Sequence, residues 1–449
     1  MIIINIGELT GIVPEGTLRK QGAEMSETGT IRNAWLRIAP DGTILDFGPM
    51  DDLPGAGLEM GSSDVSGCSG MGMGGPTLAL TNRRPAHPQP GIPTDKQVIN
   101  AEGGMVLPAF CDSHTHIVYA GSRQGEFIDK INGLSYEQIA ARGGGILNSS
   151  DLLHNTNEEE LFRQSMERVQ EMIAKGSATI EIKSGYGLNP EDELKMLRVI
   201  RRIKDTVPAT IKSTFLGAHA VGRGYTKEQY VQEVIDMLPR AAELADFVDV
   251  FCDEGFFTPQ DTSRILQAAA RHGLRPKIHA NELAESGGVQ IGVKYNALSV
   301  DHLERAGDPE IEALKGSETM PTMLPGSSFF LGLPYGRATD FIAAGLGIAL
   351  ASDYNPGSSP MGDMRFVMAL ACIRMKLTPV QALNAVTLNS AYAMGVSHLT
   401  GSITPGKRAD LIITLPGWTL ERLPYTYQTP FIKCVLLKGV EFQTSPPQA

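Results

Sequence analysis

The sequence predicts an α/β protein, namely a (β/α)8 TIM-like barrel with a small β-sandwich-like domain built from both termini. Short apolar runs alternate with helical stretches between about residues 105 and 402, and both ends of the sequence read as β only. Strands that alternate with helices form βαβ units, and seven or eight such units in about 300 residues favour a closed barrel. An open dinucleotide-binding sheet is disfavoured, because no G-x-G-x-x-G follows the first strand of this region.

The N-terminal part of the small domain is expected over residues 1–104. "MIIINI" is a strand candidate, and two alternating runs flank Asp41-Gly42, which is a strong signal for a two-residue hairpin. Residues 51–93 differ from their surroundings, because Gly, Ser and Met dominate and little apolar surface can be buried there. We therefore expect a flexible insertion at residues 51–93.

The barrel is expected over residues 105–402. Its strand candidates are "ATIEIK", "STFLGA", "DFVDVFC", "PKIHA", "ALSVDH", "TMPTM" and "GIALAS". The helical stretches between them include "EEELFRQSMERVQEMIA", "EDELKMLRVIRRIKD", "TKEQYVQEVIDMLPRAAEL" and "TSRILQAAARHGL". The chain then returns to β with "GKRADLIITL" and "PFIKCVLLKGVEF", so residues 403–449 are expected to complete the small domain.

Composition and charge limit the class of partner. The net charge of -11 disfavours nucleic acid and anionic membranes, since an acidic protein repels both. The five cysteines include no C-x-x-C pair, which argues against a cysteine-ligated zinc site. The N-terminus lacks a basic leader segment, and no apolar run reaches about 18 residues. We therefore expect a cytoplasmic protein that acts on a small molecule.

Polar side chains stand at the C-terminal ends of six strand candidates. In a barrel these ends meet at one mouth, where active sites lie. A single histidine at a strand end is more often a hydrogen-bonded core residue, but five at one rim favour a functional site. The residues are His114, His116, Lys183, Tyr186, His219, His279, Glu282, His302, Asp353 and Asn355.

The ligand types favour a transition metal. Imidazoles with one carboxylate suit Zn²⁺ or iron, whereas Mg²⁺ and Ca²⁺ prefer oxygen ligands. His114 and His116 are two residues apart and would point to opposite faces of a regular strand. The strand must therefore end or bulge near Thr115 if both imidazoles are to reach one ion.

Several motifs together resemble those of the imidazolonepropionase family, within the metal-dependent amidohydrolase superfamily. They are "PAFCDSHTHIVYAGSR", "IEIKSGYGL", "FLGAHA", "IHANEL", "VDHLE" and "ASDYNPGSSP". The resemblance covers about residues 1–50 and 94–445. The H-x-H pair and the strand-end aspartate are common to the superfamily, whereas Arg123, Tyr186, His219 and "DYNPGS" are specific to this family. Residues 51–93 depart from the family pattern, because they are longer and richer in glycine than its usual loop.

The resemblance implies hydrolysis of the cyclic amide C–N bond of 4-imidazolone-5-propanoate to N-formimino-L-glutamate, the third step of L-histidine degradation. It implies one Zn²⁺ or Fe²⁺/Fe³⁺ ion per subunit. The implied ligands are His114, His116, His279 and Asp353. Lys183 stands near the place of the carboxylated lysine of dinuclear relatives, and we interpret it as a structural or substrate-side residue. We also expect a homodimer.

Roles follow for the remaining candidates. We expect Glu282, His302 and Asp353 to be catalytic: Asp353 as the base for water, Glu282 as the proton shuttle, and His302 as the group that polarises the carbonyl or holds the hydroxide. Arg123 should bind the propionate carboxylate, because a guanidinium matches it bidentately. The other substrate-binding candidates are Tyr136, Tyr186, His219, Glu282, Asn355, Gly357 and Ser358. The segment "ARGGGI" at residues 141–146 is a candidate loop for closing over the site.

Two other functions stay open. The first is an amidohydrolase-superfamily deaminase of a nucleobase or another cyclic amidine, because such enzymes share the metal ligands and H-x-x-E. The second is a non-enzymatic binding protein on a decayed barrel, which would require broken ligands, and none of the expected ligands is missing from this sequence.

Overall fold

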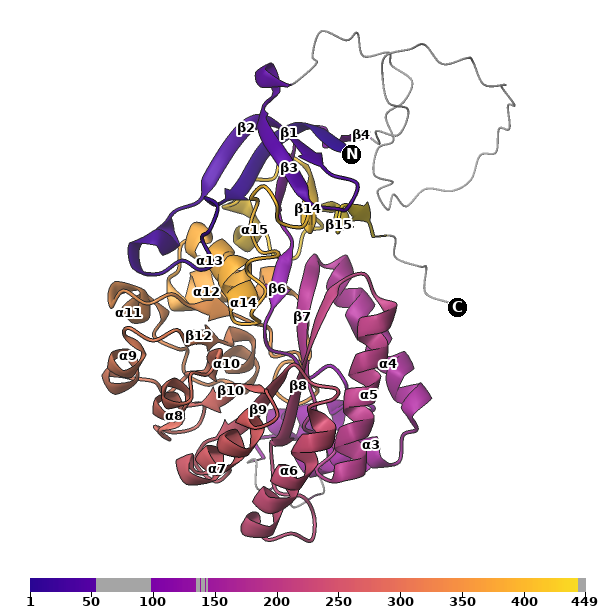
Figure 1. Ribbon diagram of the computed structural model, residues 1–449, viewed down its shortest axis with the longest axis vertical. Coiled ribbons are helices and arrows are strands. Elements are labelled where there is room, and N and C mark those ends of the chain that lie inside the picture. The colour runs from indigo at the N-terminus through magenta and orange to yellow at the C-terminus, as the bar shows by residue number, and fades with distance from the viewer. Residues whose placement is uncertain (54–97, 135–137, 139–141, 143, 443–449) are drawn as a thin grey trace, which may run out of the picture.

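The structure, a computed structural model, describes residues 1–53, 98–134, 138, 142 and 144–442. It has two parts, a small sheet and a barrel surrounded by helices (Figure 1). Tyr136 and most of the expected insertion at 51–93 lie outside the described residues, as does part of the "ARGGGI" segment. Among the described residues, no helix is both long enough and apolar enough to cross a membrane.

The small sheet combines strands from both ends of the chain, which confirms that part of the predicted fold. Its strand order is β16-β15-β14-β5-β1-β2-β3, with β4 paired to β1. Antiparallel pairing of β5 with β14 joins the N-terminal strands to the C-terminal ones. The strands are β1 (Ile2–Ile12), β2 (Gly29–Ile38), β3 (Ile44–Pro49), β4 (Val98–Asn100), β5 (Gly104–Pro108), β14 (Leu411–Pro416), β15 (Ile432–Leu437) and β16 (Val440–Glu441).

The predicted hairpin connects β2 and β3, but its loop is longer than the expected two residues. The strands pair in antiparallel register, with Ile38 opposite Ile44 at the loop end. The five residues between them are closed by a hydrogen bond from Ala39 N to Thr43 O at 2.8 Å. Asp41 Oδ1 accepts a further hydrogen bond from Thr43 N, and this local side-chain bond favours the longer turn.

The apolar run at residues 104–112 is divided between the two sheets. Its first part is β5, and the first barrel strand, β6, begins at Phe110 and ends at Asp112. The hydrogen bonds change partner at this point: Ala109 N donates to Asp410 O, whereas Phe110 N donates to Gly176 O next to the barrel. The chain therefore passes from one sheet to the other within one apolar stretch.

The barrel strands lie in sequence order, β6 through β13, as a (β/α)8 barrel requires. All seven strand pairs in this order are parallel, which confirms the predicted fold class. The strands are β6 (Phe110–Asp112), β7 (Ser177–Lys183), β8 (Thr210–Ala218), β9 (Phe247–Cys252), β10 (Arg275–Ala280), β11 (Ser299–His302), β12 (Met320–Met323) and β13 (Ala349–Leu350).

Side-chain caps define where the long outer helices begin. Asn157 and Asn189 accept hydrogen bonds from backbone amides in the first turns of α4 and α5. Thr226 and Thr258 form capping boxes at the starts of α6 and α7. The helices are α1 (Gln124–Ile131), α3 (Ile146–His154), α4 (Glu158–Ala174), α5 (Pro190–Thr206), α6 (Lys227–Ala241), α7 (Pro259–Ala270), α8 (Gly288–Lys294), α9 (Asp308–Leu314), α10 (Pro325–Leu331), α11 (Ala338–Ala343), α12 (Met364–Met375), α13 (Pro379–Val386), α14 (Leu388–Tyr392) and α15 (Arg422–Tyr425), with 3-10 turns η1 (Gly22–Ser26) and η2 (Met50–Asp52).

The first and last barrel strands meet through the residues that follow them. Thr115 and Tyr354 form a parallel bridge, and His116 N donates to Tyr354 O at 2.9 Å. Asp353 N donates to the carbonyl oxygen of His114 at 3.1 Å. This seam brings the H-x-H segment against the segment that contains Asp353.

Candidate active site

The two histidines of the H-x-H pair point to one place. Because β6 ends at Asp112, His114 and His116 lie beyond the regular strand. Their Nε2 atoms are 3.2 Å apart, and both residues are buried. The strand therefore ends before the pair, as a shared ion requires.

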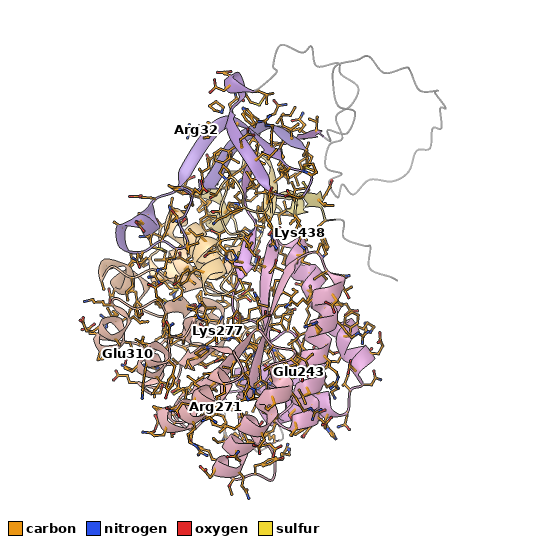
Figure 2. The ribbon with its side chains drawn as sticks, in the orientation of Figure 1. Arg32, Glu243, Arg271, Lys277, Glu310 and Lys438 are labelled. Carbon is orange, nitrogen blue, oxygen red and sulfur yellow. The ribbon has the colours of Figure 1, made fainter. Side chains whose placement is uncertain are left out.

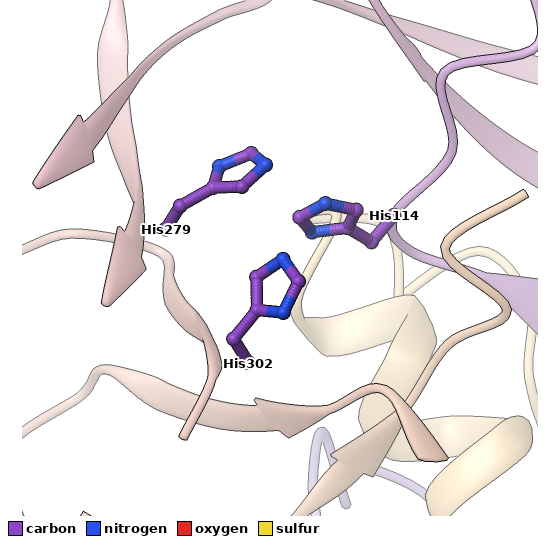
Figure 3. Close-up of side chains that lie close together, drawn as sticks. All are labelled: His114, His279 and His302. Atoms are coloured by element: carbon purple, nitrogen blue, oxygen red, sulfur yellow. The ribbon is translucent and has the colours of Figure 1, made fainter. Parts of the chain in front are cut away.

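His279 and Asp353 complete this cluster from two other strands. His279 Nε2 lies 3.4 Å from His116 Nε2. Asp353 Oδ1 lies 3.7 Å from His114 Nε2 and 3.6 Å from His116 Nε2. Figure 3 shows His114 and His279 facing each other, with His302 beside them. The structure thus brings together all four residues expected as metal ligands.

Buried carboxylates lie behind two of these imidazoles. His114 Nδ1 is 2.7 Å from Asp301 Oδ2, and His279 Nδ1 is 2.9 Å from Asp249 Oδ2. A carboxylate beside Nδ1 makes that nitrogen the protonated one, which leaves Nε2 as a lone-pair donor. Burial and the positive charge of Lys183 hold the pKa of His114 well below its usual range, so its ring is neutral.

This arrangement fits a metal ion. At least two Nε2 lone pairs face the same small space, together with one carboxylate oxygen of Asp353. His116 Nε2 lies 3.2 Å from His114 Nε2 and 3.4 Å from His279 Nε2, and a single N–H on it could bond only one of them, whereas a cation between them would satisfy both. Three imidazoles and one carboxylate are a donor set typical of Zn²⁺ or iron. The geometry also allows a second group, made of His114, His279 and His302.

His302 differs from the other imidazoles because carboxylates lie on both sides of it. Its Nε2 is 3.5 Å from Glu282 Oε2, and its Nδ1 is 3.5 Å from Glu304 Oε2. Burial acts to lower the pKa of His302, but these carboxylates outweigh it and hold that pKa well above its usual range. A protonated imidazole has no lone pair for a metal, so His302 is better suited to donate hydrogen bonds. Burial raises the pKa of Glu282 to about 7.

A network of five buried charges lies inside the barrel beneath the histidines. Lys183 Nζ is 2.8 Å from both Glu181 Oε1 and Asp249 Oδ2. Lys277, labelled inside the barrel in Figure 2, pairs with Glu181 and lies 3.7 Å from Asp301 Oδ2. All five side chains are fully buried.

The network explains the position of Lys183. Burial alone would lower its pKa, but Asp249 and Glu181 outweigh that effect and hold the pKa of Lys183 above its usual range. A carboxylated lysine needs a neutral amine. Lys183 instead pairs with two buried carboxylates, which favours its ammonium form and a structural role.

Tyr186 and His219 lie on another side of the cluster. The His219 ring stacks on His116 with centroids 5.2 Å apart, and the Tyr186 ring is 6.0 Å from His116. His219 Nδ1 donates to Gly185 O at 3.0 Å. Burial and the nearby His279 lower the pKa of His219 to about 3, so this ring is neutral. Burial raises the pKa of Tyr186 above its usual range, so its hydroxyl remains a donor.

Arg123 is paired within the protein. Its Nε and Nη2 donate to Glu126 Oε2 at 2.9 and 2.6 Å. Its Nη1 lies against Gly357, where an added Cβ would be only 2.2 Å away. Arg123 is thus held beside the turn that follows Asp353.

Asn355 organises that turn. Its Oδ1 accepts hydrogen bonds from Gly357 N and Ser358 N, both at 2.8 Å. Ser358 Oγ donates to Asp353 Oδ2 at 3.2 Å. The groups expected to meet substrate here therefore bond to one another and to Asp353, so their role as substrate contacts stays a prediction.

Sequence reasoning missed the carboxylates behind the histidines. Glu181, Asp249 and Asp301 are each the single acidic residue of a fully buried parallel strand. A lone acid in such a strand must point into the barrel or be paired, and this was the available signal. Glu126, which orients Arg123, carries no comparable signal, because an acid in the first turn of a helix is common.

Comparison with known proteins defines the class. The amidohydrolase family model matches residues 105–440, which include all the barrel strands and part of the small sheet. The chain belongs to the amidohydrolase family.

Within that class, the chain is similar to imidazolonepropionases over almost its whole length. It is 49% identical to "Imidazolonepropionase" of Flavobacterium johnsoniae and 46% identical to that of Christiangramia forsetii, with at least 98% of each chain covered. These relatives confirm the resemblance drawn from the motifs.

Solved structures share the fold. A 5-methylcytosine deaminase from Klebsiella pneumoniae, liganded with 5-fluorocytosine, has a TM-score of 0.68 at 14% identity and covers 100% of this chain and 98% of its own. An adenosine deaminase from Xanthomonas campestris with bound zinc has a TM-score of 0.63 at 13% identity, with 98% and 92% covered. At these identities the likeness concerns the fold alone.

Proposed function

We propose that this hydrolase converts 4-imidazolone-5-propanoate and water to N-formimino-L-glutamate, the third step of L-histidine degradation. The imidazolonepropionases at 46–49% identity support this assignment. The observation that carries it is the buried convergence of His114, His116, His279 and Asp353 at the barrel mouth. The water oxygen is added to the ring carbonyl carbon, which becomes a carboxylate, and the released ring nitrogen takes up a proton.

We assign the four converging residues as ligands of one Zn²⁺ or Fe²⁺/Fe³⁺ ion per subunit. The support comes from the Nε2 lone pairs that face one another and from the carboxylates behind His114 and His279. Such an ion supplies Lewis-acid chemistry that makes water a better nucleophile near neutral pH. His302 is left out of the ligand set because Glu282 and Glu304 favour its protonated form.

The catalytic roles follow from charge and proximity. Asp353 is the carboxylate that faces the Nε2 atoms of His114 and His116, which supports its role as the group that accepts the proton of the attacking water. Glu282 has its pKa raised to about 7, which suits a group that both accepts and returns a proton. Protonated His302 is placed to donate a hydrogen bond to the carbonyl oxygen as negative charge develops there.

The substrate-side residues hold the ring and its acidic tail. Arg123 is partly buried beside the turn at Gly357 and held by Glu126, and a guanidinium in that position suits the propionate. Tyr186 and His219 line the His116 side with a donor hydroxyl and a neutral ring. Asn355, Gly357, Ser358 and Tyr136 complete the proposed substrate contacts.

The decisive experiment combines metal analysis with an ultraviolet assay of imidazolone propionate consumption. We expect about one Zn or Fe per chain, loss of activity with chelator, and recovery when the ion is restored. Ammonia release from cytosine or guanine without imidazolone turnover would select the deaminase alternative. Stoichiometric metal with no turnover of either substrate class would leave a binding protein.

Assembly and location complete the proposal. We propose a cytoplasmic homodimer that has no nucleic-acid or membrane partner, in keeping with the net charge of -11. Light scattering on a size-exclusion column would distinguish a dimer of about twice 48.3 kDa from a monomer.

A further inference from the structure

Glu193, a buried carboxylate on α5, binds the loop that contains Tyr186. Its Oε2 accepts a hydrogen bond from Gly185 N at 3.0 Å. Its Oε1 accepts from Gly187 N at 2.7 Å and from Leu188 N at 3.0 Å. The side chain is fully buried, so water does not compete for these bonds. One carboxylate therefore holds the amides on both sides of Tyr186.

The loop has little freedom apart from this contact. Gly185 has φ +116°, which glycine adopts readily, and Leu188 has φ +52°, a left-handed conformation that is unfavourable for a residue with a Cβ and needs outside support. A Cβ at Gly187 would lie 2.3 Å from Glu193 N, so the loop packs directly on the start of α5. At the opposite edge of the loop, Gly185 O accepts a hydrogen bond from His219 Nδ1. Movement at Glu193 would therefore displace both Tyr186 and His219.

Asp253 holds the loop of Glu282 in the same way. Its Oδ2 accepts from Glu282 N at 2.8 Å and from Leu283 N at 2.9 Å, and its Oδ1 accepts from Ala284 N at 3.2 Å. Asp253 directly follows β9 and is only 4% exposed. The neighbouring Asn281 has φ +56°, so this loop also leaves its strand in a left-handed conformation.

Neither carboxylate is neutralised by a cation. Across the ranges that the structure describes, Glu193 and Asp253 take part in no ion pair, and each is bonded chiefly to backbone amides of one loop. Burying a carboxylate is unfavourable unless its oxygens are hydrogen-bonded, and burial raises the pKa of Glu193 to about 7, so the ionised form of each acid depends on its loop keeping this conformation. The reverse also holds: a loop with three amides on one anion has one preferred shape.

We propose that Glu193 and Asp253 are positioning residues, which set the places of Tyr186 and Glu282 for the substrate. The inference rests on the proposed function, because it assigns Tyr186 to substrate binding and Glu282 to proton transfer. Glu193 acts on binding, and Asp253 acts on the chemical step. Neither residue is among the four proposed metal ligands.

Isosteric variants test the two roles separately. Glu193→Gln and Asp253→Asn keep side-chain size but replace one acceptor oxygen with an NH2 group that faces loop amides. We expect Glu193→Gln to raise KM about 10- to 100-fold with a smaller change in kcat. Asp253→Asn should lower kcat about 10- to 100-fold with a smaller change in KM. Both variants should contain as much metal as the parent protein.

The matched controls are Glu191→Gln and Glu254→Gln, which remove the same charge from exposed neighbours. Both should leave KM and kcat within about twofold of the parent. Equal losses in the controls would show that net charge, and not loop geometry, is responsible. Loss of metal from Glu193→Gln or Asp253→Asn would show a general structural role and overturn the proposal.

Hydrogen exchange of the full-length protein without substrate supplies a readout that does not depend on activity. In Glu193→Gln, the amides of Gly187 and Leu188 should exchange at least tenfold faster than in the parent. In Asp253→Asn, the amides of residues 282–284 should exchange at least tenfold faster than in the parent. Unchanged exchange, or faster exchange with unchanged KM and kcat, overturns the inference. If the parent itself does not consume imidazolone propionate, the proposed function fails, and the exchange data alone decide whether the carboxylates hold these loops.

Discussion

The interior of the small sheet and the interior of the barrel near its mouth are built from different kinds of side chain. The core of the small sheet is largely aliphatic, with residues such as Ile3, Leu9, Leu36 and Leu411 fully or almost fully buried. The barrel mouth instead buries imidazoles, carboxylates and two lysines, of which Lys183 and the others in its network are fully buried.

This difference separates the residues that stabilise the fold from the residues that serve the chemistry of the site. Aliphatic burial contributes about 25 cal/mol per Å² and depends little on direction. A buried ion pair contributes little net stability, because desolvation offsets the attraction. The charges at the mouth are therefore better explained by the imidazoles they orient than by folding. Substitutions in the two regions should have different effects.

The largest effect should come from His279→Ala. Removing one proposed ligand should abolish stoichiometric metal and lower kcat/KM by at least about 10⁴-fold, roughly 5.5 kcal/mol. Circular dichroism should show an intact fold, since the aliphatic cores are untouched. His272→Ala, on an exposed histidine after α7, is the control. Full metal occupancy in His279→Ala would contradict the ligand assignment.

The second-largest effect should come from Lys183→Met. The change leaves Glu181 and Asp249 without their shared cation, which should cost about 3–5 kcal/mol of unfolding free energy. Urea unfolding measures this cost, and metal affinity should fall as well, because Asp249 supports His279. A fully stable variant with parent affinity would show that the network is not needed.

Leu36→Ala provides the contrast from the small sheet. Leu36 is fully buried, and truncation should cost about 2–5 kcal/mol of unfolding free energy. The kcat and KM of the remaining folded enzyme should match those of the parent. A change in either constant would mean that the sheet influences the site, and the separation between the two regions would fail.

Arg123→Met should lower kcat/KM by about 2–4 kcal/mol, because the propionate loses its cationic partner. Metal content should not change, and the variant should discriminate poorly between the natural substrate and an imidazolone without the acidic tail. Arg163→Met, on the exposed side of α4, is the control. A variant that keeps its full preference for the acidic substrate would show that Arg123 is not the carboxylate anchor.

The smallest effect should come from replacing residues 51–93 with a short Gly-Ser linker. Loop length contributes little to stability, since each doubling costs about 0.6 kcal/mol. Turnover should therefore stay close to that of the parent in the same ultraviolet assay. A large fall in kcat would show that this segment reaches the barrel mouth.

Pattern reasoning predicted most of the fold. Alternation of strands with helices predicted the barrel, and β sequence at both ends predicted the shared sheet. It did not predict that the run at 104–112 changes sheets between Ala109 and Phe110. Apolar strands of both sheets look alike in sequence, and only the hydrogen-bond partners, Asp410 and Gly176, distinguish them.

At the site, the sequence predicted which residues lie at the barrel mouth but not which side chains they bond to. His114, His116, His279 and Asp353 could be named because strand ends converge in a barrel. The pairing of Arg123 with Glu126, or of Asn355 with its own turn, depends on loop conformation, which residue spacing does not determine.

The seam between the first and last barrel strands has a consequence for how the chain matures. Ser352 N donates to Asp112 Oδ1 across 240 positions of sequence. At about 5–20 residues per second, synthesis of that interval takes on the order of tens of seconds. His114 and His116 are therefore synthesised about half of the translation time before Asp353 can join them. An ion held by both edges of the ring would bind tightly only after closure, so metal uptake during refolding would measure how quickly the barrel closes.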